Sequence, residues 1–234
     1  MMSPPFAMMP GMVRTLRIKG FSETGRPIST PTTKFGGQPG WLAGPQWPIS
    51  AAWGRPMRFV GQIELGPVIG AAGQGRMAYV FVTHADHEED FFDPDIVDPD
   101  GGENAVIVQP GGHYAGPVRP LATGPGLYGV DGSEVEYTVD LRAADEPGSV
   151  TDEELEGLPS TDRSRYVELT DGDQIGGTPL FFQGDEWPDG GPWRLLLQLD
   201  SNWLPFHLDL GAAPRLFAFV SEDGTEGRLL VQDS

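Results

Sequence analysis

The chain has 234 residues, of which 34 are acidic and 15 are Lys or Arg, so its formal net charge is −19 at pH 7. A field of this sign repels phosphate backbones and anionic lipid, and we therefore predict that the protein binds neither nucleic acid nor a membrane surface. The 33 glycines and 23 prolines indicate many turns, while 12 Phe, 6 Trp and 5 Tyr provide apolar surface for a core. No cysteine is present, which excludes disulfides and thiolate chemistry and fits a reducing compartment.

The first 30 residues predict an arm followed by an edge strand. Residues 1–12 are apolar but contain three prolines and no basic residue, unlike a secretory signal peptide. Residues 13–18, VRTLRI, alternate apolar with polar or basic side chains, as a strand does. No apolar run approaches the roughly 18 residues of a membrane span. We therefore expect a cytoplasmic protein in which residues 31–234 form a single domain.

Two segments of the chain follow one pattern. Residues 36–48 read GGQPGWLAGPQWP and residues 176–188 read GGTPLFFQGDEWP, so Gly-Gly-any-Pro and Trp-Pro recur at identical spacing. Each segment leads to a strand-like run, 56–64 or 192–200, in which Pro, Arg, Gln and a final acid occupy matching positions. Two chance copies of so long a pattern are improbable. We infer a duplicated supersecondary unit.

The apolar pattern predicts further strands, two of which extend the repeats. The predicted strands are residues 77–83, 105–108, 135–141 and 216–221. With them, the two repeats extend over about 34–83 and 174–221.

One short helix is expected to begin at Thr151. Its side chain can cap the helix while Glu154, three residues later, returns a bond, and Gly157 and Pro159 end the segment. The fold class that follows is a strand-rich α+β protein. We expect internally duplicated β units to form one compact globular unit with few short helices.

The repeat residues also resemble a known family. The similarity covers about residues 34–221 and rests on the sequences KFGGQP at 34–39, GQIEL at 61–65 and LLLQLDS at 195–201. These residues are similar to the YwqG-like, or DUF1963, family of uncharacterised bacterial proteins. A later turn of that family, Trp-Gly-Asp-any-Gly, reads HLDLG at 207–211 here, so Asp209 and the final Gly are kept. The resemblance implies a compact, strand-rich α+β fold with an internal duplication, and it implies no activity.

Alternation along the two equivalent strands predicts one apolar and one polar face. The apolar face, which we expect in the core, comprises Phe59, Ile63, Leu195, Leu197 and Leu199. If the halves pack about a pseudo-twofold axis, the polar faces would line one cleft. The candidate binding residues are Gln62, Glu64, Gln198, Asp200 and Asp209, with Arg58 and Arg194. The alternative is that these groups bond neighbouring backbone or face water, and that Trp47 and Trp187 anchor turns rather than stack on a ligand.

Other polar residues are weak candidates for metal binding or hydrolysis. The acidic loop 84–104 contains His84 and His87 but no fixed-spacing metal signature, so a solvated loop is expected and neither a metal nor a cofactor is predicted. Ser201, His207 and Asp209 suggest a nucleophile, a general base and the residue that orients the base. Ser201, however, lacks the Gly-any-Ser-any-Gly turn of such hydrolases.

The sequence therefore favours non-catalytic binding of a protein partner or a small ligand, with no catalytic residue assigned. A metal- or carboxylate-assisted hydrolase is one alternative. Another is an immunity-like or stress-associated protein whose negative surface attracts a basic protein partner.

Overall fold

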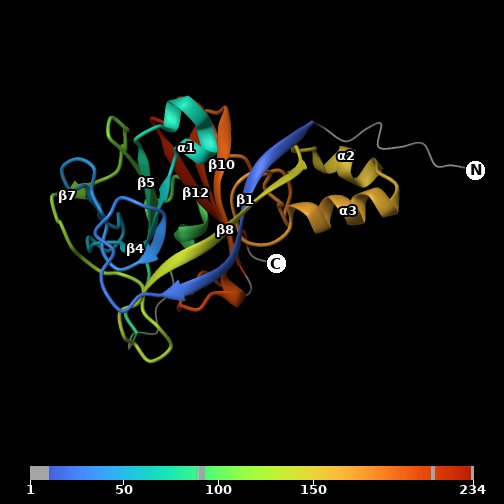
Figure 1. Cartoon of the computed structure of the whole chain (residues 1–234). Coiled ribbons are helices and arrows are strands. Elements are labelled where there is room, and N and C mark those ends of the chain that lie inside the picture. The colour runs from blue at the N-terminus through green and yellow to red at the C-terminus, as the bar shows by residue number, and fades with distance from the viewer. Residues whose placement is uncertain (1–10, 88, 90–92, 212–213, 233–234) are drawn as a thin grey trace, which may run out of the picture.

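A single sheet of ten antiparallel strands dominates the computed structural model, which describes residues 11–87, 89, 93–211 and 214–232 (Figure 1). Its strands are, in sheet order, β12 (Gly227–Gln232), β11 (Arg215–Ser221), β10 (Trp193–Asp200), β9 (Gln174–Gly176), β1 (Met12–Glu23), β8 (Glu136–Pro147), β2 (Lys34–Gly36), β4 (Arg58–Glu64), β5 (Met77–Val82) and β6 (Asn104–Gln109). A separate small ladder pairs β3 (Trp47–Pro48) with β7 (Val118–Arg119). The predicted strand-rich α+β class is confirmed.

The strand order is repeated on the two sides of a central pair. β1 and β8 form a long antiparallel pair in the middle of the sheet. Outward from β1 lie β9, β10, β11 and β12, and outward from β8 lie β2, β4, β5 and β6. The two predicted repeats therefore occupy equivalent places, and each continues to a fourth strand, β6 or β12. The segment expected as an edge strand is instead paired on both sides, with β8 and with β9.

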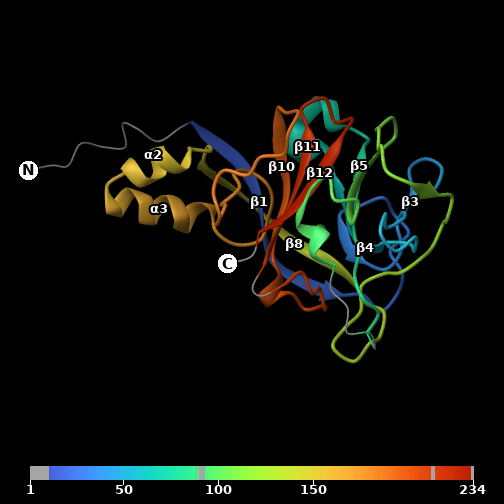
Figure 2. The same cartoon turned by 180° about the vertical axis from the view of Figure 1, so that it is seen from behind.

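The two outer strands, β6 and β12, approach each other, so the sheet nearly closes (Figure 2). The His113 N–H donates to the Thr225 carbonyl across this gap at 2.7 Å. A Cβ at Gly227 would lie 2.4 Å from Cγ1 of Val106, so only a glycine fits there. The near closure leaves little of either sheet edge open to other chains.

Apolar side chains fill the sheet on both faces. A large interior cluster takes residues from both halves, among them Phe35, Leu196 and Val231. The outer face of each half has its own smaller cluster, one around Trp47 and one around Trp193. Because both faces are covered, these strands are rich in Val, Leu and Phe rather than alternating. The expectation of one polar face is therefore wrong.

A bulge at the same position in each repeat explains this error. β4 pairs Phe59 with Phe81 and Gly61 with Val80, which leaves Val60 as an extra residue. β10 has the same shift between Leu195 and Leu197. The five residues expected in the core are all buried, with at most 1% exposed, but Phe59 and Leu195 face the outer clusters and the other three face the interior.

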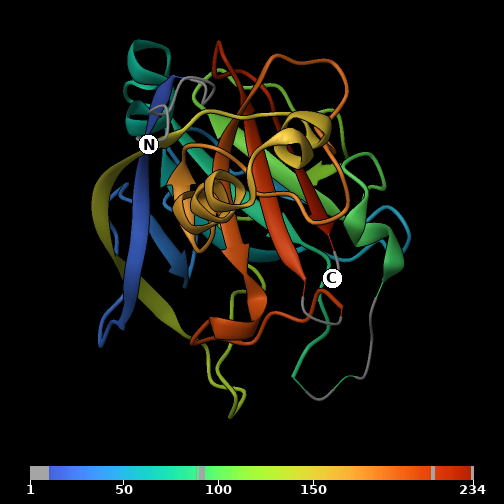
Figure 3. The same cartoon turned by 90° about the vertical axis from the view of Figure 1, so that its right-hand side faces the viewer.

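The helices lie at the margin of the sheet. α1 (Gly66–Ile69) is a single turn, and α2 (Asp152–Gly157) and α3 (Ser160–Thr170) form a pair that projects beyond β8 and β1 (Figures 1 and 3). The predicted capping box of α2 is confirmed, since the Thr151 side chain accepts from Glu154 N–H and the Glu154 carboxylate accepts from Thr151 N–H. α3 was not expected from the sequence. No helix within the described residues is long and apolar enough to span a membrane.

Candidate functional site: a groove where β4 begins and β5 ends

The repeated Gly-Gly pair makes a turn that packs on a buried carboxylate in each half. Gly37 and Gly177 have φ of 62° and 86°, in the left-handed region that favours glycine. A Cβ would lie 2.5 Å from Cδ of Glu136 at Gly37, and 2.2 Å from Oε1 of Glu146 at Gly177. Glu136 forms a buried ion pair with Lys34. The motif therefore serves the fold, and no ligand is needed to explain it.

Gln62 and Gln198 make the same hydrogen bonds in the two halves. Gln62 accepts from Gly40 N–H at 2.7 Å and donates to the Thr32 carbonyl at 2.8 Å. Gln198 accepts from Leu180 N–H at 2.9 Å and donates through Nε2 to the Gly172 carbonyl at 2.8 Å. Both glutamines are fully buried, and their amides hold the loops that precede and follow β2 and β9.

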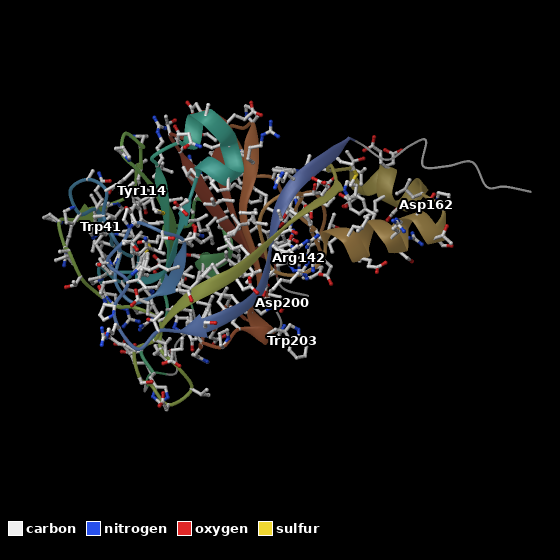
Figure 4. All side chains as sticks on the ribbon, viewed as in Figure 1. Trp41, Tyr114, Arg142, Asp162, Asp200 and Trp203 are labelled. Atoms are coloured by element: carbon white, nitrogen blue, oxygen red, sulfur yellow. The ribbon has the colours of Figure 1, made fainter. Side chains whose placement is uncertain are left out.

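The structure does not bring the predicted cleft residues together. Four strands separate β4, with Gln62 and Glu64, from β10, with Gln198 and Asp200. Glu64 is exposed, and Asp200 lies with Trp203 at the lower side of the second half (Figure 4). Arg194 is exposed at the start of β10 and pairs with Glu222 at 2.6 Å. The expected shared cleft is not formed, because the space between the two copies is filled by the apolar interior cluster, to which both copies contribute.

A cluster of acids surrounds Arg215 near Asp200. The buried Arg215 donates to Asp171 at 2.6 Å and lies 4.1 Å above the ring of Phe182. Asp173 accepts from Asp200 N–H at 2.8 Å, and burial, followed by the negative charge of Asp200, raises the pKa of Asp173 to about 6. This cluster is an internal charge network in which Asp171 pairs with Nη2 of the buried Arg215, while the Nε–H of Arg215 has no acceptor among the described residues.

Residues far apart in the sequence meet at the other end of the first half. His84 follows β5 and is 8% exposed. Its Nε2 lies 2.6 Å from Asp209 N–H, which donates to it, so Nδ1 carries the hydrogen and donates to the Ala85 carbonyl at 2.8 Å. Burial lowers the pKa of His84 to about 4. The ring is therefore neutral, and it joins the acidic loop to the segment from the second half.

Tyr128 is the centre of this cluster. Its ring stacks on His207 at 5.5 Å and meets the rings of His84 and His87 edge-on at 5.8 and 5.7 Å. Its hydroxyl donates to the Ala85 carbonyl at 3.0 Å, and burial raises its pKa. Three of the four histidines of the chain thus contact one tyrosine.

Arg58 lies under this cluster and is only 5% exposed. Its guanidinium sits 4.7 Å from the centre of the Tyr128 ring and donates to the Gly126 carbonyl. Nη2 donates to the Ala85 carbonyl at 3.1 Å and to Asp86 at 2.5 Å. The Nε–H is shielded from solvent and has no acceptor among the described residues. Arg58 thus differs from its exposed counterpart Arg194.

A groove of about 770 Å³ opens beside Arg58 and Tyr128. One side is formed by Asp86, His87 and Glu89, and the other by residues 124–134, the yellow-green loop at the lower edge of Figure 1. The charged lining residues are Arg58, Asp86, Glu89, Asp131 and Glu134. Of the predicted site residues, Arg58 lines the groove and Asp209 supports it through His84. The sequence did not indicate Tyr128 or the 124–134 wall, since neither belongs to a recognisable motif.

The residues considered for hydrolysis are engaged elsewhere. The Ser201 hydroxyl donates to the Pro214 carbonyl at 3.1 Å, while His207 stacks on Tyr128. In the part of the chain that the structure describes, no three His, Asp or Glu side chains are grouped as a metal site.

The family of the chain is shown by its sequence. A family model described as "Domain of unknown function (DUF1963)" matches residues 33–214, which is well over half of the chain. The chain therefore belongs to this family, as the resemblance of its repeats suggested. No curated protein matches it.

Proposed function

We propose that this protein is a non-catalytic binding protein and that the groove beside Arg58 and Tyr128 holds its ligand. The observation that supports this most is a concave site of about 770 Å³ over a rigid base. The base is rigid because Arg58, Tyr128 and His84 are buried and bonded to main-chain groups from distant segments. Preorganised sites of this kind lose little entropy when a ligand binds.

The geometry favours binding over hydrolysis. Both ring nitrogens of His84 are used by backbone groups, so His84 offers no free lone pair to a substrate. Burial keeps Tyr128 protonated, and Ser201 donates to a carbonyl. A general base within reach of a nucleophile, which hydrolysis requires, is not formed by these residues.

The charge supports a partner with basic groups. The net charge of −19 attracts cations over long range, and four carboxylates line the groove itself. The acidic surface makes a basic protein partner the natural second candidate. We expect its association rate to fall steeply with salt.

Amide chemical-shift mapping tests the proposal. The ¹⁵N-labelled protein is titrated with a library of polar metabolites and short peptides. Saturable shifts are expected at residues 85–87, 89 and 124–134, with every ligand recovered unchanged. Glu134→Trp, which narrows the groove, should abolish them, whereas Glu156→Trp on α2 should not. Shifts confined to other surfaces, or conversion of a ligand to product, would contradict it.

A further inference from the structure

We propose that the ligand carries both a carboxylate and a cationic amine or guanidine, as a basic amino acid or the C-terminal Lys or Arg of a peptide does. This inference rests on the proposed function, because it names the ligand of the same groove. It comes from two incompletely matched charges, one on each wall.

The first incompletely matched charge is on Arg58, whose guanidinium has one edge that lacks an acceptor. In arginine, Nε–H and one Nη2–H point in the same direction and together bind a carboxylate through two parallel bonds. Here Asp86 accepts from Nη2 alone, and Nε has no acceptor within the described residues. The Asp86 side chain is 72% exposed, so it can move into solvent at little cost. A ligand carboxylate in its place would satisfy both donors.

The second feature lies on the opposite wall. Hydrogen bonds from the hydroxyl and the N–H of Ser133 lower the pKa of Asp131, which is therefore ionised at neutral pH. Glu134 is exposed three residues later. Neither carboxylate forms an ion pair within the described part of the chain, whereas Asp86 pairs with Arg58 and Glu89 pairs with Arg55.

Only a dipolar ligand matches both walls. A simple anion would meet the field of a chain with net charge −19. A simple cation would gain nothing from Arg58, whose Nε–H would stay without an acceptor as it is in the free protein. Lysine and arginine separate their carboxylate from the side-chain cation by a long flexible stem. One such molecule carries a carboxylate for Arg58 and a cation for Asp131 and Glu134, which line the same groove.

Titrations followed by amide shifts decide the ligand class. The probes are L-arginine, agmatine, which has the same cation without the carboxylate, and the tripeptide Gly-Gly-Arg. L-Arginine or the tripeptide should shift the amide signals of residues 85–87, 89 and 124–134 saturably. Agmatine should bind about tenfold more weakly, since it lacks the charge-assisted pair with Arg58. Tighter binding of the tripeptide assigns a peptide terminus, and tighter binding of L-arginine assigns the free amino acid.

Two variants test the walls separately. Glu134→Gln should weaken both L-arginine and agmatine up to about fivefold, the range of an exposed ion pair. Arg58→Lys, which removes the two-bond edge, should weaken L-arginine about tenfold and leave agmatine unchanged. Glu156→Gln on α2 makes the same charge change far from the groove and should alter neither. If Arg58→Lys does not fold, the comparison of L-arginine with agmatine on the unchanged protein still decides the question.

Agmatine that binds as tightly as L-arginine would overturn the inference. So would the absence of saturable shifts with all three probes. Tight binding of agmatine in the groove would leave the proposed function standing. If none of the three probes shifts the groove amides, the proposed function stands only if other ligands of the library do.

Discussion

At the scale of single residues, the buried His84 and the partly buried Asp173 have pKa values shifted by burial, in opposite directions. Burial, followed by the positive charge of Arg58, lowers the pKa of His84 to about 4, and its neutral ring accepts from Asp209 N–H at Nε2. Asp173 has a pKa near 6 because it is partly buried beside Asp200. Each shift links protonation to stability.

His84 should make the protein less stable in acid. The unfolded chain binds a proton at His84 below about pH 6.5, but the folded protein binds it only near pH 4. The contribution of His84 to the free energy of unfolding is therefore present above pH 6.5. It is lost as the pH falls to 4, by up to about 3 kcal/mol. His84→Gln keeps an acceptor for Asp209 and does not titrate. Urea unfolding between pH 7 and 4 should show a flatter profile for the variant, and parallel profiles would contradict the account.

Asp173 should change the stability with pH in the opposite direction, with a contribution that is largest in acid. Its folded pKa lies above the unfolded value of 3.8, so its contribution is largest below pH 3.8 and is lost as the pH rises through 6. Asp173→Asn keeps an acceptor for Asp200 N–H and removes the charge. The variant should therefore gain stability relative to the wild type between pH 4 and 6, by up to about 3 kcal/mol. Urea unfolding measures the difference in the free energy of unfolding between the variant and the wild type. If this difference does not change between pH 4 and 6, the pKa of Asp173 is not raised.

At the scale of elements, each repeat is a set of strands with a loop fastened over its outer face. Gln109 on β6 donates to the Gly44 carbonyl at 2.9 Å, and Gln232 on β12 donates to the Gly184 carbonyl at 3.3 Å. Gln62 and Gln198 fasten the same loops from β4 and β10. Trp47 is fully buried under its loop, whereas Trp187 is 37% exposed, so the first half is the more completely covered.

Removal of a loop-fastening glutamine should cost stability. Gln198→Ala leaves the Leu180 N–H and two carbonyls without their partner in a buried site. Unsatisfied groups of this kind cost about 1–3 kcal/mol each, and solvent can recover part of that loss. We expect a decrease in the free energy of unfolding on the order of 3 kcal/mol. The exposed Gln74→Ala is the control, and equal midpoints for both variants would refute the role of Gln198.

The bulged strand β10 provides a test of the core. Leu197 is fully buried in the interior cluster, so Leu197→Ala should cost about 2–5 kcal/mol through lost transfer free energy and the cavity. Glu156→Ala, on the exposed part of α2, should leave the denaturation midpoint nearly unchanged. A wild-type midpoint for Leu197→Ala would mean that β10 is placed wrongly.

The sequence predicted the elements better than their faces. Gly-Gly-any-Pro and Trp-Pro are local patterns, so the repeats, the main strands and the cap at Thr151 were accessible. The bulges at Val60 and Leu196 were not, because an apolar run pairs equally well with or without an extra residue. Only part of the site could be predicted from the sequence. Arg58, Tyr128 and Asp209 meet only through the strand order, and no local pattern encodes that.

At the scale of the whole molecule, the two halves are equivalent in topology and differ at one end. The connection between them contributes Tyr128 and the 124–134 wall, and the second half contributes His207 and Asp209. The counterpart position in the second half has the exposed pair Arg194–Glu222 instead of a buried arginine. The duplicated strands therefore form the sheet, and the segments that differ between the two halves form the groove.

We propose that this groove binds a ligand without changing it. The most direct test is a crystal structure of the protein grown with the ligand that causes the largest amide shifts. We expect the intact ligand to lie between Arg58 and the 131–134 turn, with Tyr128 and His84 unmoved. Density for the ligand elsewhere on the molecule, or for a cleaved product in the groove, would contradict it.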